Sequence, residues 1–252
     1  MLAQSKGILV GRKFTPFTLD QTEIPQMLQD WLSRGFLVPK DAANMAEISS
    51  ISRVLVPYFI YNCQIAVEWR GYGGDYVRET VAGAGGTAEV KKVVNWVEQS
   101  GLVQDQLQET RLASKDIDRH LRRFFLKYGW EGKPVGDWSE VAARELNATV
   151  IPADLDAQKI FTREFQGKLF RKIESEINRS VHGEEKRGIT WRKFLEYRYL
   201  ELYAPYYSVS YTYQGKEYQL TIDASETSRQ TGKKPRRSIF SLFRKSKPES
   251  NE

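Results

Sequence analysis

Side chains that commonly carry catalysis or bind metals are scarce in this chain of 252 residues. The two histidines, His120 and His182, show no metal-ligand spacing such as HxxxH. Cys63 is the only cysteine, which excludes an intramolecular disulfide and a cysteine-based zinc site. His182 precedes Glu184 and Glu185, a group that we interpret as loop polarity rather than an acid–base pair.

No GxSxG or GxxxxGK[ST] motif is present, so the sequence identifies no nucleophile and no phosphate-binding loop. We therefore predict no catalytic residue, no structural zinc and no cofactor, and a protein that is not an enzyme. One alternative stays open: a hydrolase or transferase site assembled around His120 or His182 from carboxylates that are distant in the sequence.

The net positive charge of the chain lies in its C-terminal segment. Residues 229–252 hold eight basic and two acidic side chains, which accounts for the whole formal net charge of +6 and leaves residues 1–228 neutral. A dense cationic segment beside a neutral domain indicates an anionic partner, which could be a membrane surface, nucleic acid or an acidic protein.

Within this segment, RRSIFSLFRKSK places its apolar side chains on one side of a helical wheel and its basic side chains on the other. This pattern is typical of a short helix that forms on an anionic bilayer. The alternatives are a solvated tail that aids solubility, and a segment that contacts nucleic-acid phosphates and stacks on bases. The predicted residues that bind a membrane or another anionic partner are Lys233, Lys234, Arg236, Arg237, Ile239, Phe240, Leu242, Phe243, Arg244, Lys245 and Lys247.

A second candidate surface is aromatic. Tyrosines concentrate in VPYFIY and APYYSVSYTY, and Tyr58, Tyr61, Tyr206 and Tyr211 could line a groove for a peptide, a glycan or a base. Side chains of this kind on alternating strands more often form the core and rim of a sheet. Both interpretations stay open at this point.

The elements that would position these residues are helices and strands in alternation. Phe161, Phe165, Leu169, Ile173 and Ile177 recur at four-residue spacing, which predicts a helix with one buried face. By the same criterion and by capping residues, helices are predicted at 18–34, 40–50, 115–128, 139–147 and 154–180.

Strands are predicted where β-branched and aromatic residues concentrate. Residues 54–69 followed by RGYGGDY indicate two strands joined by a turn at 70–75, with a loop at 82–90 and a returning strand at 95–108. Residues 202–224 predict a hairpin with one apolar and one polar face, because apolar and polar residues alternate around the turn at Gln214-Gly215.

The two strand regions, 54–80 and 202–224, resemble each other. Each combines a proline–aromatic pair, an alternating strand and a glycine-containing turn. They could be two copies of one duplicated unit, or a coincidence of generic patterns.

The order of KFTPFTL, DWLSRGFLVPKD, VPYFIY with RGYGGDY, and APYYSVSYTYQGKEY resembles a family of bacterial TFIIB-type zinc-ribbon-containing, primosomal-protein-N′-like proteins. The resemblance covers about residues 13–224 and concerns the region downstream of the ribbon. The ribbon's paired CxxC motifs are absent, and Asp223-Ala224-Ser225 replaces the family's glycine, so neither zinc binding nor helicase activity carries over. Many relatives have membrane-spanning segments after this region, and the resemblance implies that the basic segment substitutes for them.

We thus expect an α+β protein whose antiparallel sheet is built from two similar hairpins with several packing helices. The body would span 1–228, and 229–252 would be a disordered tail or a helix induced by a surface. No apolar run is long enough for a membrane span or a signal peptide, so we expect a cytoplasmic protein, peripheral to the inner face of the membrane when bound. The expected function is a non-enzymatic adaptor or scaffold on an anionic membrane or protein partner; the alternative is a nucleic-acid-binding accessory protein of replication, repair or transcription.

Overall fold

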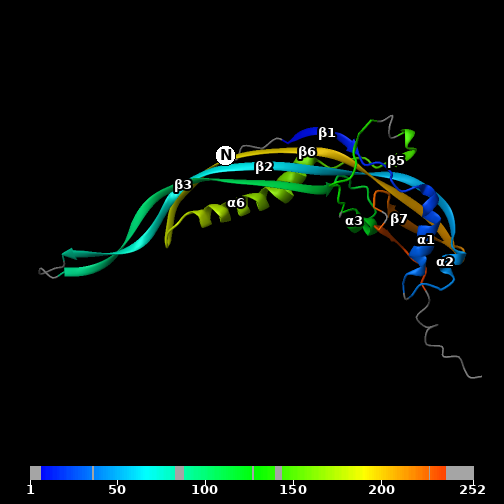
Figure 1. The fold of residues 1–252 in the computed structure, drawn as a ribbon, viewed down its shortest axis with the longest axis horizontal. Coiled ribbons are helices and arrows are strands. Elements are labelled where there is room, and N and C mark those ends of the chain that lie inside the picture. The colour runs from blue at the N-terminus through cyan, green and yellow to red at the C-terminus, as the bar shows by residue number, and fades with distance from the viewer. Residues whose placement is uncertain are drawn as a thin grey trace, which may run out of the picture. The chain divides into compact units, whose positions relative to one another are not determined.

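The computed structural model describes residues 7–35, 37–82, 88–126, 128–139, 144–226 and 228–236. It confirms the α+β class: the described strands form one sheet in the order β3-β2-β6-β1-β4, in which β7 pairs with β6, β8 with β7, and β5 with β2 (Figure 1). The chain divides into two compact units. Unit 1 comprises Met1–Gly11, Ile60–Thr110 and Leu155–Leu200, and unit 2 comprises Arg12–Phe59, Arg111–Asp154 and Glu201–Glu252.

The sheet of unit 1 is formed by parts of three long strands and by the first residues of β1 (Ile8–Phe14). The long strands are β2 (Glu47–Ala82), β3 (Ala88–Leu112) and β6 (Glu185–Tyr213). The predicted turn at 70–75 is wrong, because β2 continues through it without interruption. Its glycines make room for neighbours instead: a Cβ atom on Gly73 would overlap the carbonyl oxygen of His182, and one on Gly74 would overlap Val94. Residues 54–80 therefore form no hairpin of their own. Of the predicted loop at 82–90, residues 83–87 lie outside the described residues, and residues 82 and 88–90 belong to β2 and β3 instead.

One helical segment covers one face of this sheet. It runs through α5 (Ala157–Ile160), the π-helical turn η2 (Phe161–Gln166) and α6 (Gly167–Ser180), which confirms the predicted helix at 154–180. At about 100° per residue, Phe161 and Ile177 would lie about 160° apart around a regular α-helix. The wider π turn reduces this drift, and all five apolar side chains of the predicted face are buried.

The strands of unit 1 present alternate side chains to the helix and to the other side. Tyr61, Ile65 and Trp69 of β2 are buried, and the ring of Tyr61 lies 5.3 Å from that of Phe165. Glu68 and the other even-numbered side chains between them are mostly exposed.

Unit 2 begins its core with a capped helix. The carboxylate of Asp20 accepts a hydrogen bond from the amide of Thr22, and Glu23 completes the capping box before η1 (Gln21–Glu23) and α1 (Ile24–Ser33). The buried stripe Ile24, Leu28 and Leu32 belongs to one core cluster with residues of β6 and β7. The predicted helix at 40–50 is shorter than expected, since α2 spans Ala42–Met45 and β2 starts at Glu47.

The predicted hairpin at 202–224 is confirmed. The end of β6 pairs with β7 (Lys216–Asp223) in antiparallel register from Tyr206↔Asp223 to Tyr213↔Lys216. Gln214 and Gly215 have φ angles of 50° and 72°, the combination that a two-residue type I′ turn requires.

Shorter elements complete unit 2. The helix predicted at 115–128 is α3 (Arg119–Phe125), and its cap is Asp118, whose carboxylate accepts from the amide of His120. Of the predicted helix at 139–147, residues 140–143 lie outside the described residues, and residues 144–145 are helical. The remaining strands are β1 (Ile8–Phe14), which begins in unit 1, β4 (Gly136–Asp137), β5 (Ala148–Val150) and β8 (Gln230–Gly232).

Candidate anionic-surface site

The first part of the predicted tail belongs to the folded body. Strand β8 pairs antiparallel with β7, with Ile222 opposite Gln230 and Leu220 opposite Gly232. The amide of Lys233 then donates to the carbonyl of Gln219 at 3.1 Å. The boundary that the sequence placed at residue 229 is therefore corrected: residues 229–236 are part of unit 2, because β7 offers them backbone hydrogen-bonding partners.

Arg229 is an internal residue and not a free tail cation. Its Nη1 lies 2.9 Å from Oδ2 of Asp223, which is fully buried, and its Nη2 donates to the carbonyl oxygen of Phe124 at 3.0 Å. The other carboxylate oxygen of Asp223 accepts from the amide and the hydroxyl of Ser225. One of the eight basic residues counted in the segment is thus neutralised inside the fold.

Lys234 is also held by the body. Its Nζ atom lies 3.9 Å from the ring centroid of Trp31, and it donates to the carbonyl oxygens of Trp31 and Arg34. Partial burial and the neighbouring charge of Arg34 lower the pKa of the Lys234 ammonium group. The contact fixes the chain against the C-terminal end of α1.

These contacts shape a hollow of about 530 Å³ where the described chain ends, which we call the C-terminal hollow. Trp31 and Tyr218 supply half-buried aromatic rings, and Lys233 and Arg236 are exposed. The hollow thus combines aromatic rings with cations at one surface. It is lined by Trp31, Tyr218, Gly232, Lys233, Lys234 and Arg236.

The structure describes three of the predicted binding residues, Lys233, Lys234 and Arg236, and brings them together at this hollow. Sequence reasoning missed Trp31 and Tyr218, which lie about 200 and 15 positions away from Lys233 along the chain. The remaining predicted residues lie outside the described residues: Arg237, Ile239, Phe240, Leu242, Phe243, Arg244, Lys245 and Lys247.

The predicted aromatic groove is wrong, and the alternative of a sheet core is confirmed. Tyr58, Tyr61, Tyr206 and Tyr211 are at most 1% exposed. The hydroxyl groups of Tyr58 and Tyr206 share a hydrogen bond of 3.0 Å, that of Tyr61 donates to the carbonyl of Ala157, and that of Tyr211 donates to the carbonyl of Lys233. Such rings stabilise the core because their single polar atoms are satisfied there.

These buried tyrosines predict a specific response to alkali. Burial raises the pKa of Tyr211 to about 12 and also raises the pKa values of Tyr58 and Tyr206, whereas an unfolded tyrosine ionises near pH 10. The stabilisation from protonated phenols is therefore complete below about pH 10 and is lost as the pH rises above it. In native protein, we expect the part of the phenolate absorbance that comes from these buried tyrosines to appear only together with the loss of circular dichroism. In guanidinium-denatured protein the same absorbance should appear near pH 10. Ionisation of every tyrosine near pH 10 in protein that keeps its dichroism would contradict this.

The residues that could do chemistry are separate from one another. His120 and His182 are exposed; the backbone of His182 is hydrogen-bonded to the side chain of Gln99. Cys63 is buried, and burial raises the pKa of its thiol to about 12. Within the described residues, no group of three or more histidine, cysteine or carboxylate side chains is placed to hold a metal ion.

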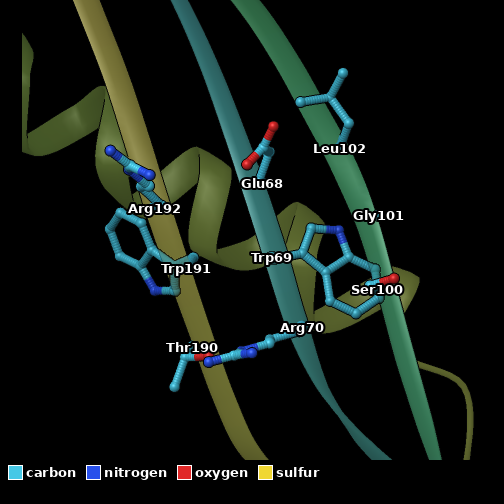
Figure 2. A pocket seen from close by; sticks show the side chains of 9 residues that line it. All are labelled: Glu68, Trp69, Arg70, Ser100, Gly101, Leu102, Thr190, Trp191 and Arg192. Atoms are coloured by element: carbon cyan, nitrogen blue, oxygen red, sulfur yellow. The ribbon is translucent and has the colours of Figure 1, made fainter.

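Unit 1 contains a second hollow, of about 780 Å³, that sequence reasoning missed. Figure 2 shows the side chains that line it on the three adjacent strands of the sheet, with Glu68 and Arg70 on β2, Ser100 and Leu102 on β3, and Arg192 on β6. The alternation of apolar and polar residues along β2 is the one feature of the sequence that indicates which of its side chains are exposed there. The assembly itself depends on strands that are far apart in the sequence.

The fold and the C-terminal hollow define the chain as an α+β protein with a basic and aromatic surface at its last strand. Comparison of the chain with family models, with curated proteins and with solved structures finds no match. The resemblance to the region downstream of a zinc ribbon therefore stays a prediction. Among the helices that the structure describes, none has the length and apolar character needed to cross a membrane.

Proposed function

We propose that the protein is a non-enzymatic adaptor that attaches to an anionic membrane surface through the C-terminal hollow and the basic segment after it. The observation that carries the proposal is the clustering of Lys233, Lys234 and Arg236 beside Trp31 and Tyr218. Tryptophan and tyrosine favour the headgroup level of a bilayer, and each basic residue near an anionic leaflet contributes about 1 kcal/mol. The apolar side chains of RRSIFSLFRKSK would add contacts with acyl chains.

Nucleic acid is the competing partner, and two features favour the membrane over it. Lys234 already lies over the ring of Trp31, so that face of the ring is not available to stack on a base. The segment beyond Arg236 also contains the aliphatic residues Ile239 and Leu242, which suit acyl chains better than base edges.

The structure improves the choice of truncation for the test. A chain ending at residue 228 would lose β8 and Arg229 and would leave the buried carboxylate of Asp223 without its cation. A chain ending at Arg236 keeps both. Its thermal unfolding, compared with that of the full chain, is the control for folding.

We expect the full chain to co-sediment with phosphatidylserine-containing vesicles and the 1–236 chain to bind them at least about tenfold more weakly, because it lacks four of the basic residues. Replacing Lys233 and Arg236 by alanine in the 1–236 chain should weaken binding further. Neutral phosphatidylcholine vesicles are the lipid control. Equal binding of both chains would overturn the proposal, and salt-sensitive retention of single-stranded DNA without vesicle binding would support the nucleic-acid alternative.

A further inference from the structure

The end of the sheet in unit 1 consists of two strands alone. Residues 76–82 of β2 and 88–94 of β3 start beside the first residue of β6, where Tyr76 donates to Glu185, and continue past it and past the end of α6 (Figure 1). We call this pair of segments the distal ribbon. All of its residues are exposed except Val81, Val93 and Val94, which are half-buried.

Two contacts show which side chains of the two strands lie on the same face of the ribbon. A Cβ atom on Gly74 would meet Val94 and Trp96, and the Nζ atom of Lys92 lies 3.7 Å from the ring centroid of Tyr76. Because side chains alternate between the faces of a strand, these contacts assign the even-numbered ribbon residues to one face and the odd-numbered ones to the other.

The two faces carry opposite charge. The basic face consists of Tyr76, Arg78, Thr80, Val90, Lys92 and Val94. Tyr76 lies at its base, where its hydroxyl and amide donate to the carboxylates of Glu185 and Glu184. Beyond Tyr76 the face holds two cations and no acid, for a net charge of +2. The acidic face holds two acids and one cation, for a net charge of −1, and consists of Val77, Glu79, Val81, Glu89, Lys91 and Val93.

Each face also exposes apolar side chains. Val90 is 65% exposed and Tyr76 38% on the basic face, and Val77 is 37% exposed on the acidic face. A two-stranded ribbon is marginally stable in water unless its side chains pack against something else. Tyr76 donates its hydroxyl hydrogen to Glu185, the first residue of β6. Beyond Tyr76, no third strand or helix among the described residues pairs with the ribbon.

We propose that a second copy of the chain covers the distal ribbon, with the basic face of one copy against the acidic face of the next. Charge decides the pairing of faces. Two basic faces would bring Arg78 and Lys92 of both copies together, and two acidic faces would oppose Glu79 and Glu89. Unlike faces attract, and each such contact buries the two exposed apolar side chains of one copy's basic face and the one of the next copy's acidic face. The partner has the right length and strand geometry because it is the same ribbon.

This arrangement is heterologous, because each copy contributes different surfaces to its two contacts. Such contacts close into a ring when the rotation permits, or continue as an open assembly. We therefore expect a mass distribution of the full chain that shifts beyond the dimer as its concentration rises.

The test is sedimentation of the full chain and of three charge-reversed variants. Arg78→Glu with Lys92→Glu reverses the basic face, and Glu79→Lys with Glu89→Lys reverses the acidic face. Each of these two ribbon variants alone should associate at least about tenfold more weakly than the unmodified chain, since like charges then face each other. The matched control, Lys168→Glu with Arg171→Glu, changes two exposed cations of α6 and should associate as the unmodified chain does.

Mixing separates a loss of complementarity from a loss of folding. In an equimolar mixture of the two ribbon variants, every contact between unlike chains again joins opposite charges. The mixture should recover the mass distribution of the unmodified chain. A monomeric unmodified chain at all concentrations, association by each variant alone, or a mixture that stays monomeric would each overturn the proposal.

Discussion

Replacing Arg229 by methionine is expected to lower the free energy of unfolding of unit 2 by about 3–5 kcal/mol, the cost of leaving a buried charge without its partner. Asp223 is fully buried and receives one guanidinium nitrogen at 2.9 Å, and methionine would fill much of the same volume without neutralising the carboxylate. Urea unfolding followed by circular dichroism measures the change.

Two further variants identify the cause. Lys233→Met removes an exposed cation four residues away and should change the free energy of unfolding by less than about 0.5 kcal/mol. Adding Asp223→Asn to Arg229→Met removes the unpaired charge and should recover part of the loss. If Arg229→Met destabilised the protein no more than Lys233→Met does, the ion pair would not contribute as described.

Replacing Phe161 by alanine is expected to destabilise unit 1 by about 3–5 kcal/mol, the usual cost of removing a buried aromatic ring. The ring stacks on Tyr197 with centroids 3.7 Å apart and lies 5.9 Å from the ring of Tyr61. Since Phe161 begins the π turn, its loss also weakens the packing of the helix start on the sheet.

Hydrogen exchange would locate this effect. Phe161→Ala should reduce the protection of β2 amides around Tyr61, which lies in unit 1, more than that of the β6–β7 hairpin in unit 2. Thr162→Ala, at the exposed neighbouring position, is the control and should leave both regions unchanged. Equal loss of protection in both units would show that the ring does not act on unit 1 selectively.

The elements that the sequence predicted well are those specified by local patterns. The five-residue apolar series from Phe161 to Ile177 marks a helix, and alternation around Gln214-Gly215 marks a hairpin, because both depend on neighbours along the chain. The predicted turn at 70–75 was wrong because the glycines there are required by close contacts with residues that are distant in the sequence. Gly73 is required by the carbonyl of His182, which no local window contains.

The candidate site was predicted in part for the same reason. Counting charges located the basic segment, but a count cannot distinguish Arg229, which is neutralised by Asp223, from Arg236, which is exposed. Trp31 is brought to Lys234 by the packing of α1 on the β6–β7 hairpin, a tertiary contact with no short-range signal.

The burial of Pro235 has a consequence for tether length. From Pro235 to Ile239 the chain advances by four residues, which even fully extended reach only about 14 Å. Any surface that engages the apolar residues 239–243 must therefore approach the folded body to within about that distance. A partner that binds the apolar residues 239–243 would therefore be held beside unit 2.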